Sequence, residues 1–103
     1  MDEQWKKIEG YENYRVSNKG RIRNTKTKQF LDGGVNSCGY VKITLSCKNK
    51  AKQFQLHRLV ARAFVDNPEH KEYVRHKDND NLNNDASNLY WMSFLEFLNR
   101  PKN

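Results

Sequence analysis

The stretch that decides the fold is VRHKDNDNLNNDASNLYW, which runs from Val74 to Trp91. Its first residues predict a short strand that leads into His76. The residues after His76 are rich in Asn and Asp, which favour loops because their side chains hydrogen-bond to their own backbone. Residues 88–92 predict the returning strand, and a helix is predicted to follow over residues 94–100. The stretch therefore predicts a strand, a polar loop, a second strand and a helix, with a histidine where the loop begins.

Two hairpins and one helix are predicted before this stretch. Bulky and polar residues alternate at 14–17 and 21–23, on either side of a turn whose Asn and Gly tolerate positive φ. A second alternating pair is found at 40–45 and 53–56. Apolar residues then recur at helical spacing from His57 onwards. We therefore predict an α+β fold.

The net charge of +7 is concentrated in the first part of the chain. Residues 1–65 hold 14 Lys/Arg against 5 Asp/Glu, a net +9, whereas residues 66–103 hold 5 against 7, a net −2. A basic surface attracts polyanions and gains free energy from counterion release when it binds phosphate. We therefore expect a basic β-hairpin module at 1–34 and a small core domain at 35–103, with nucleic acid as the first partner to consider. Charge alone also suits a merely solubilising surface.

Neither a membrane span nor a secretion signal is expected. No stretch approaches the roughly 20 apolar residues of a span, and residues 1–4 lack the basic and apolar regions of a signal peptide. We therefore expect an intracellular protein without a membrane partner. In such a compartment Cys38 and Cys47 are expected to be reduced thiols. Structural zinc is not expected, because these cysteines and His57 lack close C-x-x-C pairing and a fourth ligand.

The quoted stretch resembles the core of the HNH nucleases of phage and intron-associated endonucleases, which form a ββα-metal site. The preceding segments GYVKITL (39–45) and LHRLVARAF (56–64) are similar to those that lead into that core. The opening WKKIEGYENYRVSNKGRIRN (5–24) resembles the short DNA-binding module that often precedes it in homing endonucleases. This resemblance implies an HNH-type core at 35–103 and a metal-dependent DNA endonuclease, encoded by a phage or mobile element and acting in the cytoplasm of a bacterial host.

The resemblance assigns the general base to His76, which as a neutral imidazole can accept a proton from the attacking water. Asn88 would orient that imidazole or pin the loop. A divalent cation, Mg²⁺ with Mn²⁺ as the alternative, would stabilise charge on the phosphate and on the leaving oxygen. Relatives often carry a carboxylate or asparagine before the histidine. This chain has Arg75 there, which cannot ligate a cation but can hold a phosphate oxygen.

A further metal ligand of the family should fall near Phe97 on the closing helix. The nearest asparagine, Asn99, is displaced from Phe97 by about 200° around the helix. Three explanations stay open: Asn99 reaches the ion, the ion is held by Asp78, Asp80 or backbone oxygens, or the site is impaired. Asn99 and Asp78 are therefore the candidate metal ligands.

Double-stranded DNA is the expected partner, and the first hairpin is expected to present its arginines to phosphate. The candidate DNA-binding residues are Arg15, Lys19, Arg21, Arg23, Lys26, Lys42, Arg58, Arg62 and Arg75. The alternative function is a catalytically impaired member of the same fold that binds DNA or a protein as a phage factor. His57 is interpreted as structural or phosphate-contacting, and the residues expected in the core include Trp5, Tyr11, Tyr14, Trp91 and Phe94.

Overall fold

The computed structural model describes residues 3–31 and 33–99, and these form a strand-rich α+β fold. The elements in chain order are β1 (Trp5–Ile8), β2 (Tyr11–Ser17), β3 (Ile22–Asn24), β4 (Phe30–Leu31), β5 (Gly34–Val35), β6 (Val41–Cys47), β7 (Lys50–Gln55), α1 (Leu56–Phe64), β8 (Tyr73–His76), the 3-10 helix η1 (Ala86–Asn88), β9 (Leu89–Met92) and α2 (Phe94–Asn99). Their strands pair in three antiparallel sheets, β1-β2-β3-β4, β5-β6-β7 and β8-β9. The predicted fold class is confirmed.

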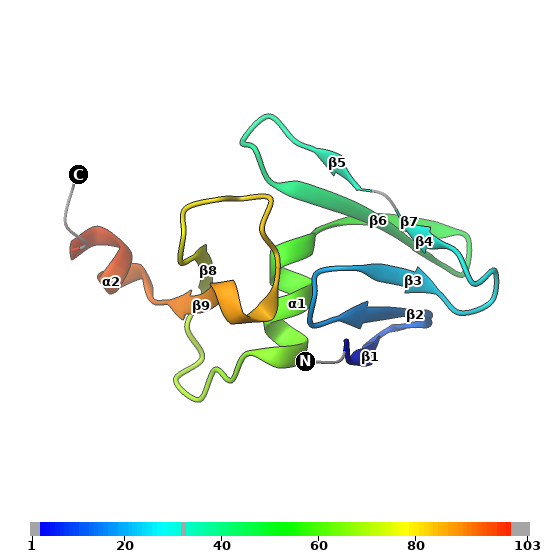
Figure 1. Cartoon of the computed structure of the whole chain (residues 1–103), viewed down its shortest axis with the longest axis horizontal. Coiled ribbons are helices and arrows are strands. Elements are labelled where there is room, and N and C mark those ends of the chain that lie inside the picture. Colours follow the sequence, from blue (N-terminus) through cyan, green and yellow to red (C-terminus); the bar gives the residue numbers. More distant parts are fainter. Residues whose placement is uncertain (1–2, 32, 100–103) are drawn as a thin grey trace.

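Helix α1 lies at the centre of the molecule (Figure 1). Sheets β1–β4 and β5–β7 lie on one side of it, and hairpin β8–β9 with its long loop lies on the other, while α2 projects at the far end. Helix α1 contacts strands of all three sheets. It therefore positions the hairpins and the loop around one core.

The first predicted hairpin is confirmed, and its sheet is wider than expected. Strands β2 and β3 pair with Arg15 opposite Arg23 and Val16 opposite Ile22. Gly20 in their turn has φ +84, a conformation that suits glycine. Strands β1 and β4 flank this hairpin on either side and were not predicted. The hairpin is therefore the middle of a four-stranded sheet.

The second predicted hairpin and the helix after it are also confirmed. Strand β6 pairs with β7 from Lys42 to Cys47, and α1 begins directly after β7. The unpredicted strand β5 adds to the free edge of β6. Predicted hairpin 73–92 is formed by β8 and β9, with His76 opposite Leu89. The predicted strand, loop, strand and helix order is thus present.

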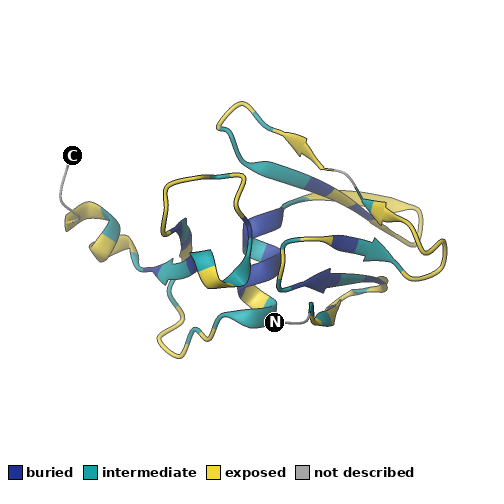
Figure 2. Cartoon of the chain, viewed as in Figure 1, coloured by how far each residue is buried: buried dark blue, intermediate teal, exposed yellow. Residues whose placement is uncertain are grey.

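The buried apolar residues gather on α1 and on the strand faces that meet it (Figure 2). Ile22 of β3, Leu45 of β6 and Val60 of α1 are almost completely buried. They belong to one cluster, to which both predicted modules contribute. The boundary at residue 34 therefore stays a prediction.

Two aromatic residues were wrongly expected in the core. Tyr14 is buried, and Tyr11 and Trp91 pack against the core cluster, as predicted. Trp5, however, lies on the outer face of the first sheet against Phe30. Phe94 is 49% exposed on α2. Aromatic rings stacked on a polar surface look the same in sequence as rings in a core.

Cys38 and Cys47 are both exposed and form no disulfide among the described residues. That they are reduced thiols in the cell stays a prediction. Among the described residues, no helix combines the length and the apolar character needed to cross a membrane.

Candidate active site and nucleic-acid interface

His76 is the last residue of β8 and is only 5% exposed. Its Nε2 lies 2.8 Å from Oδ1 of Asn84, which is equally buried. An amide oxygen can only accept a hydrogen bond, so Nε2 carries the proton and Nδ1 keeps its lone pair. The geometry therefore favours the tautomer in which Nδ1, and not Nε2, is the nitrogen that can accept a proton. Sequence reasoning missed Asn84.

Two further rings pack around His76. The ring centroid of His57 lies 5.1 Å from that of His76, and the Tyr40 ring lies 4.9 Å from His57 and 6.2 Å from His76. His57 is buried, and its Nδ1 has no hydrogen-bond partner among the described residues. Burial, followed by the charges of His76 and Arg58, lowers the pKa of His57 to about 4. His57 is therefore neutral at pH 7 and does not compete with His76 for a proton.

A hollow of about 10 Å³ lies beside His76 and is lined by Tyr40, Val74, Arg75, His76, Asn79 and Asn81. This volume is close to the space that one water molecule needs. The lining is mostly polar, which suits a water or a phosphate oxygen. Arg75, predicted to hold phosphate, thus lies at the same hollow as His76.

The predicted residues Asn88 and Asp78 lock the loop after His76. Asn88 Oδ1 accepts the backbone N–H of Asp78 at 3.2 Å, and its Nδ2 donates to Asp78 Oδ1 and to the Asn83 carbonyl, both at 2.9 Å. Asn83 Nδ2 donates to the other Asp78 oxygen at 2.9 Å. The hydrogen bond from Asn83, then those from the Asp80 backbone and Asn88, lower the pKa of Asp78 to about 2. Of the two roles predicted for Asn88, this geometry favours pinning the loop.

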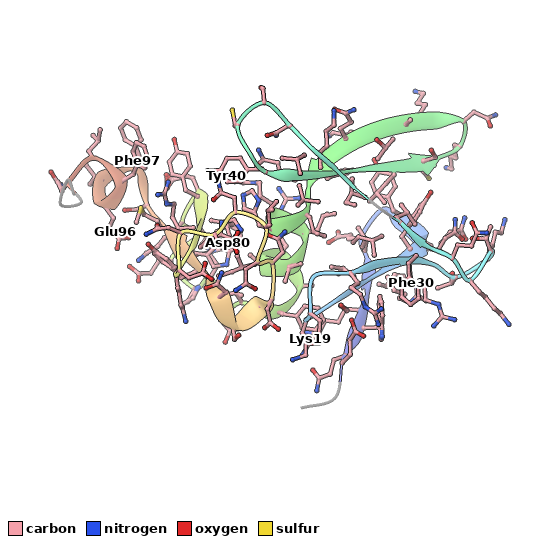
Figure 3. All side chains as sticks on the ribbon, turned by 45° about the horizontal axis from the view of Figure 1, so that its top comes forward. Lys19, Phe30, Tyr40, Asp80, Glu96 and Phe97 are labelled. Carbon is pink, nitrogen blue, oxygen red and sulfur yellow. The ribbon has the colours of Figure 1, made fainter. Side chains whose placement is uncertain are left out.

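The side chains near His76 do not form a complete ligand set for a divalent ion. Among residues 3–31 and 33–99, no three His, Cys, Asp or Glu side chains come together as ion ligands would. Both oxygens of Asp78 already accept hydrogen bonds. Phe97 stacks on Tyr73, with ring centroids 5.6 Å apart, and Asn99 is exposed at the end of α2. Figure 3 shows Phe97 on α2, and Tyr40 and Asp80 around the loop.

We expect the protein alone to bind Mg²⁺ weakly. Titration calorimetry without DNA should show no saturable binding below about 1 mM, the weak end of the range for protein sites. Asp78→Asn should leave this titration unchanged, since the Asp78 carboxylate already serves the loop. A saturable micromolar site that disappears in Asp78→Asn or Asn99→Ala would contradict this expectation and identify those residues as ligands.

The outer face of sheet β1–β4 carries a row of basic side chains. Lys7 of β1 pairs with Arg15 of β2, Arg15 pairs with Arg23 of β3, and Arg23 pairs with Phe30 of β4. Residues opposite one another in a sheet project to the same face. Val16, the neighbour of Arg15, points to the core. The sheet therefore aligns three cations and one exposed ring. Lys7 was not predicted.

The arginines of this face differ in their availability. Arg15 Nη1 donates to the carbonyls of Glu12 and Tyr14 at 2.9 and 3.2 Å. Arg23 Nε is buried and has no hydrogen-bond partner among the described residues. Arg21 forms a bidentate ion pair with Glu3. In the structure Glu3 occupies the fork of Arg21, and the phosphate contacts predicted for all three arginines stay a prediction.

The other predicted DNA-binding residues are spread over several elements. Lys26 is exposed in the β3–β4 turn, whereas Lys42 is half-buried on β6. Arg58 and Arg62 lie on α1, where burial is the main factor lowering the pKa of Arg58. Lys19 Nζ lies 3.5 Å from Asp85 Oδ2. Only the outer face of the first sheet thus aligns several of the described candidate cations side by side on neighbouring strands.

The turn between β2 and β3 packs directly on the loop that follows His76. The Ala86 N–H donates to the Asn18 carbonyl at 2.8 Å. A Cβ added at Gly20 would lie only 2.8 Å from the Asn84 carbonyl oxygen. Lys19 marks this turn in Figure 3, and Phe30 lies at the other end of the sheet. The basic sheet therefore touches the residue that bonds His76.

The sequence and the fold of this chain are both similar to those of known proteins. Residues 3–46 match the NUMOD4 motif. A protein of Acanthamoeba polyphaga mimivirus, named an uncharacterized HNH endonuclease, is 45% identical over 99 residues, which cover 96% of this chain and 30% of that protein. DNA endonuclease I-HmuI of Bacillus phage SP01 is 41% identical over 91 residues, which cover 87% of this chain and 52% of the phage protein.

A solved structure shares the fold. It is described as DNA binding and cleavage by the HNH homing endonuclease I-HmuI, and it superposes with a TM-score of 0.86 at 38% sequence identity. The match covers 92% of this chain and 55% of that one. The chain therefore spans about half, or less, of the length of these relatives.

Proposed function

We propose that this chain, which is similar to HNH endonucleases over most of its own length, binds double-stranded DNA and hydrolyses phosphodiester bonds with His76 as the general base. The observation that carries the proposal is the 2.8 Å contact between His76 Nε2 and Asn84 Oδ1. It leaves Nδ1 of a buried imidazole free to accept a proton. The likeness to the homing endonuclease I-HmuI, whose structure is described as one of DNA binding and cleavage, supports the proposal.

In this mechanism a water beside His76 gives a proton to Nδ1 while its oxygen bonds to the phosphorus atom. The bond between phosphorus and the leaving sugar oxygen breaks, and that oxygen takes a proton from solvent. The hollow of about 10 Å³ has room for that water. The imidazolium that forms keeps its Nε2 hydrogen bond to Asn84, which becomes stronger because the donor is now charged. His57 stays neutral beside it, so that the two neighbouring imidazoles of His57 and His76 together carry one positive charge. Arg75 holds a phosphate oxygen at the same hollow.

We propose a divalent cation as cofactor, Mg²⁺ before Mn²⁺, because members of this family generally use a divalent metal ion. Such an ion would stabilise charge on the phosphate.

Incubation with supercoiled plasmid tests the activity. We expect conversion to nicked or linear DNA with Mg²⁺ or Mn²⁺, and a comparison with chelator measures the need for the ion. An intact plasmid between pH 6 and 9 would contradict the endonuclease function. A second function would then apply, a phage factor of the same fold that binds DNA or a protein without cutting, which Arg75 and Phe97 favour because neither can ligate a cation.

The first prediction from this function concerns the basic row. Arg15→Gln with Arg23→Gln should weaken DNA binding and lower the slope of log Kobs against log salt by roughly 0.9 per lost phosphate contact. The matched control is Lys48→Gln with Lys50→Gln, which removes the same charge from the exposed end of hairpin β6–β7, where Lys48 lies in the turn and Lys50 begins β7. Binding titrations at several salt concentrations measure both. Equal slopes for the two double variants would mean that the row does not touch DNA.

The relatives also support a proposal on source and place of action. They include proteins of a phage and of a giant virus. We therefore expect a phage or mobile element to encode this protein. It would act where its DNA target is, inside the host cell, and the cytoplasm of a bacterium is the host compartment we expect.

A further inference from the structure

Arg21 on the outer face is held by a single carboxylate. Its Nε donates to Glu3 Oε2 at 2.9 Å, and its Nη2 donates to Oε1 of the same group. A guanidinium binds two phosphate oxygens, or O6 and N7 of a guanine, with the same fork geometry. The Glu3 carboxylate therefore occupies the position that a pair of DNA acceptors would take.

Two aromatic rings fix the orientation of this guanidinium. Arg21 Cζ lies 4.4 Å from the ring centroid of Phe30 and 5.6 Å from that of Trp5. The Phe30 ring is 49% exposed, so the stack is open to solvent. Because the rings orient the fork before a ligand arrives, binding loses less conformational entropy than it would with a mobile side chain.

We propose that Arg21 binds paired acceptors of DNA and that Glu3 holds its fork until DNA displaces the carboxylate. This inference rests on the proposed function, since it assumes that the outer face binds DNA. The hydrogen bond from Arg21 is the largest cause that lowers the pKa of Glu3, so the pair is intact at neutral pH. Glu3 thus raises the Kd for any ligand that must take the fork of Arg21.

Glu12 provides the matched control for Glu3. Its carboxylate belongs to the same sheet and lies 3.8 Å from Lys7 Nζ, with 81% of its side chain exposed. It carries the same charge as Glu3 but does not occupy the fork of Arg21. Glu3→Gln and Glu12→Gln therefore change the net charge equally, and they differ in whether the Arg21 fork is released.

Competition between Glu3 and DNA predicts tighter binding when Glu3 is neutralised. In fluorescence anisotropy titrations with a short labelled duplex, we expect Glu3→Gln to lower Kd about fivefold, the size expected for loss of one exposed ion pair. Glu12→Gln should change Kd much less. The gain should vanish in an Arg21→Gln background, since no fork is then left to release. Thermal melting of each variant confirms that it is folded, and Glu3→Ala provides a second variant without the carboxylate.

The outcomes separate this inference from the proposed function. If the wild type binds the duplex and Glu3→Gln equals Glu12→Gln, the inference is wrong and the proposed function stands. A gain that persists without Arg21 would also overturn it. If neither the wild type nor any variant binds the duplex, the proposed function fails as well.

The source of the paired acceptors can be identified with the same variants. An equal gain on an A·T duplex and on a guanine-containing duplex would show that Arg21 binds phosphate oxygens. A gain confined to the guanine-containing duplex, and lost when guanine is replaced by 7-deazaguanine, would show that it reads the base edge. Both results support the inference, because both require a fork that Glu3 otherwise fills.

Discussion

Replacing His76 by alanine should lower the rate of plasmid nicking by about 10² to 10⁴-fold, the usual cost of losing a general base. DNA binding should change little, because the basic row lies on another sheet. The two effects are measured separately, nicking by the loss of supercoiled plasmid and binding by anisotropy. Asn84→Ala should lower nicking by about 10- to 100-fold, as expected for a residue that orients a catalytic histidine.

His70→Ala is the matched control for His76→Ala. It also removes one imidazole, but His70 is exposed in the loop before β8. Its nicking rate should equal that of the wild type. A His76→Ala variant that nicks as fast as His70→Ala would remove His76 from the mechanism.

The free energy of unfolding should decrease as the pH is lowered, because of His57. Burial lowers the pKa of His57 to about 4, from an ordinary value of 6.5. Between these two pH values the unfolded chain binds a proton at His57 that the folded chain does not, so the free energy of unfolding decreases as the pH decreases. At about 1.4 kcal/mol for each pH unit of the shift, His57 should account for about 2 to 3 kcal/mol between pH 7 and pH 4. Urea denaturation at several pH values measures this loss.

His57→Phe isolates that contribution. Phenylalanine retains a ring against Tyr40 and His76, and His57 Nδ1 has no partner among the described residues to lose. The other titrating groups are the same in both proteins. The difference in unfolding free energy between wild type and His57→Phe should therefore shrink or reverse as the pH falls. Two parallel curves would show that His57 is not the group responsible.

The sequence allowed the elements with strong local patterns to be predicted. Alternation around the Gly20 turn predicted hairpin β2–β3, and helical spacing after His57 predicted α1. Strands β4 and β5 have two residues each, which is too short for alternation to be visible. They form only because neighbouring strands leave edges that they can pair with. Such pairing depends on tertiary structure and not on local pattern.

The site could be predicted only in part. His76 stands alone before a polar loop, but Asn84 is one of five asparagines between residues 79 and 88. These asparagines have the same chemistry, and only the packing of the Gly20 turn brings one of them to His76. The Glu3–Arg21 pair was missed for a similar reason. It joins residues 18 positions apart, and the paired strands bring them together.

The contact of the β2–β3 turn with the loop after His76 limits how such proteins can be recombined. A chimaera that joins residues 1–34 of this chain to another nuclease core must keep glycine at position 20 and a backbone that fits it at position 84, since any larger residue at Gly20 would meet the Asn84 carbonyl. We therefore expect the sheet that is proposed to bind DNA and the loop that carries Asn84 to be inherited together. DNA specificity should then differ between relatives through substitutions on the outer face of the first sheet. Side chains there can change without disturbing the contact between Gly20 and the Asn84 carbonyl.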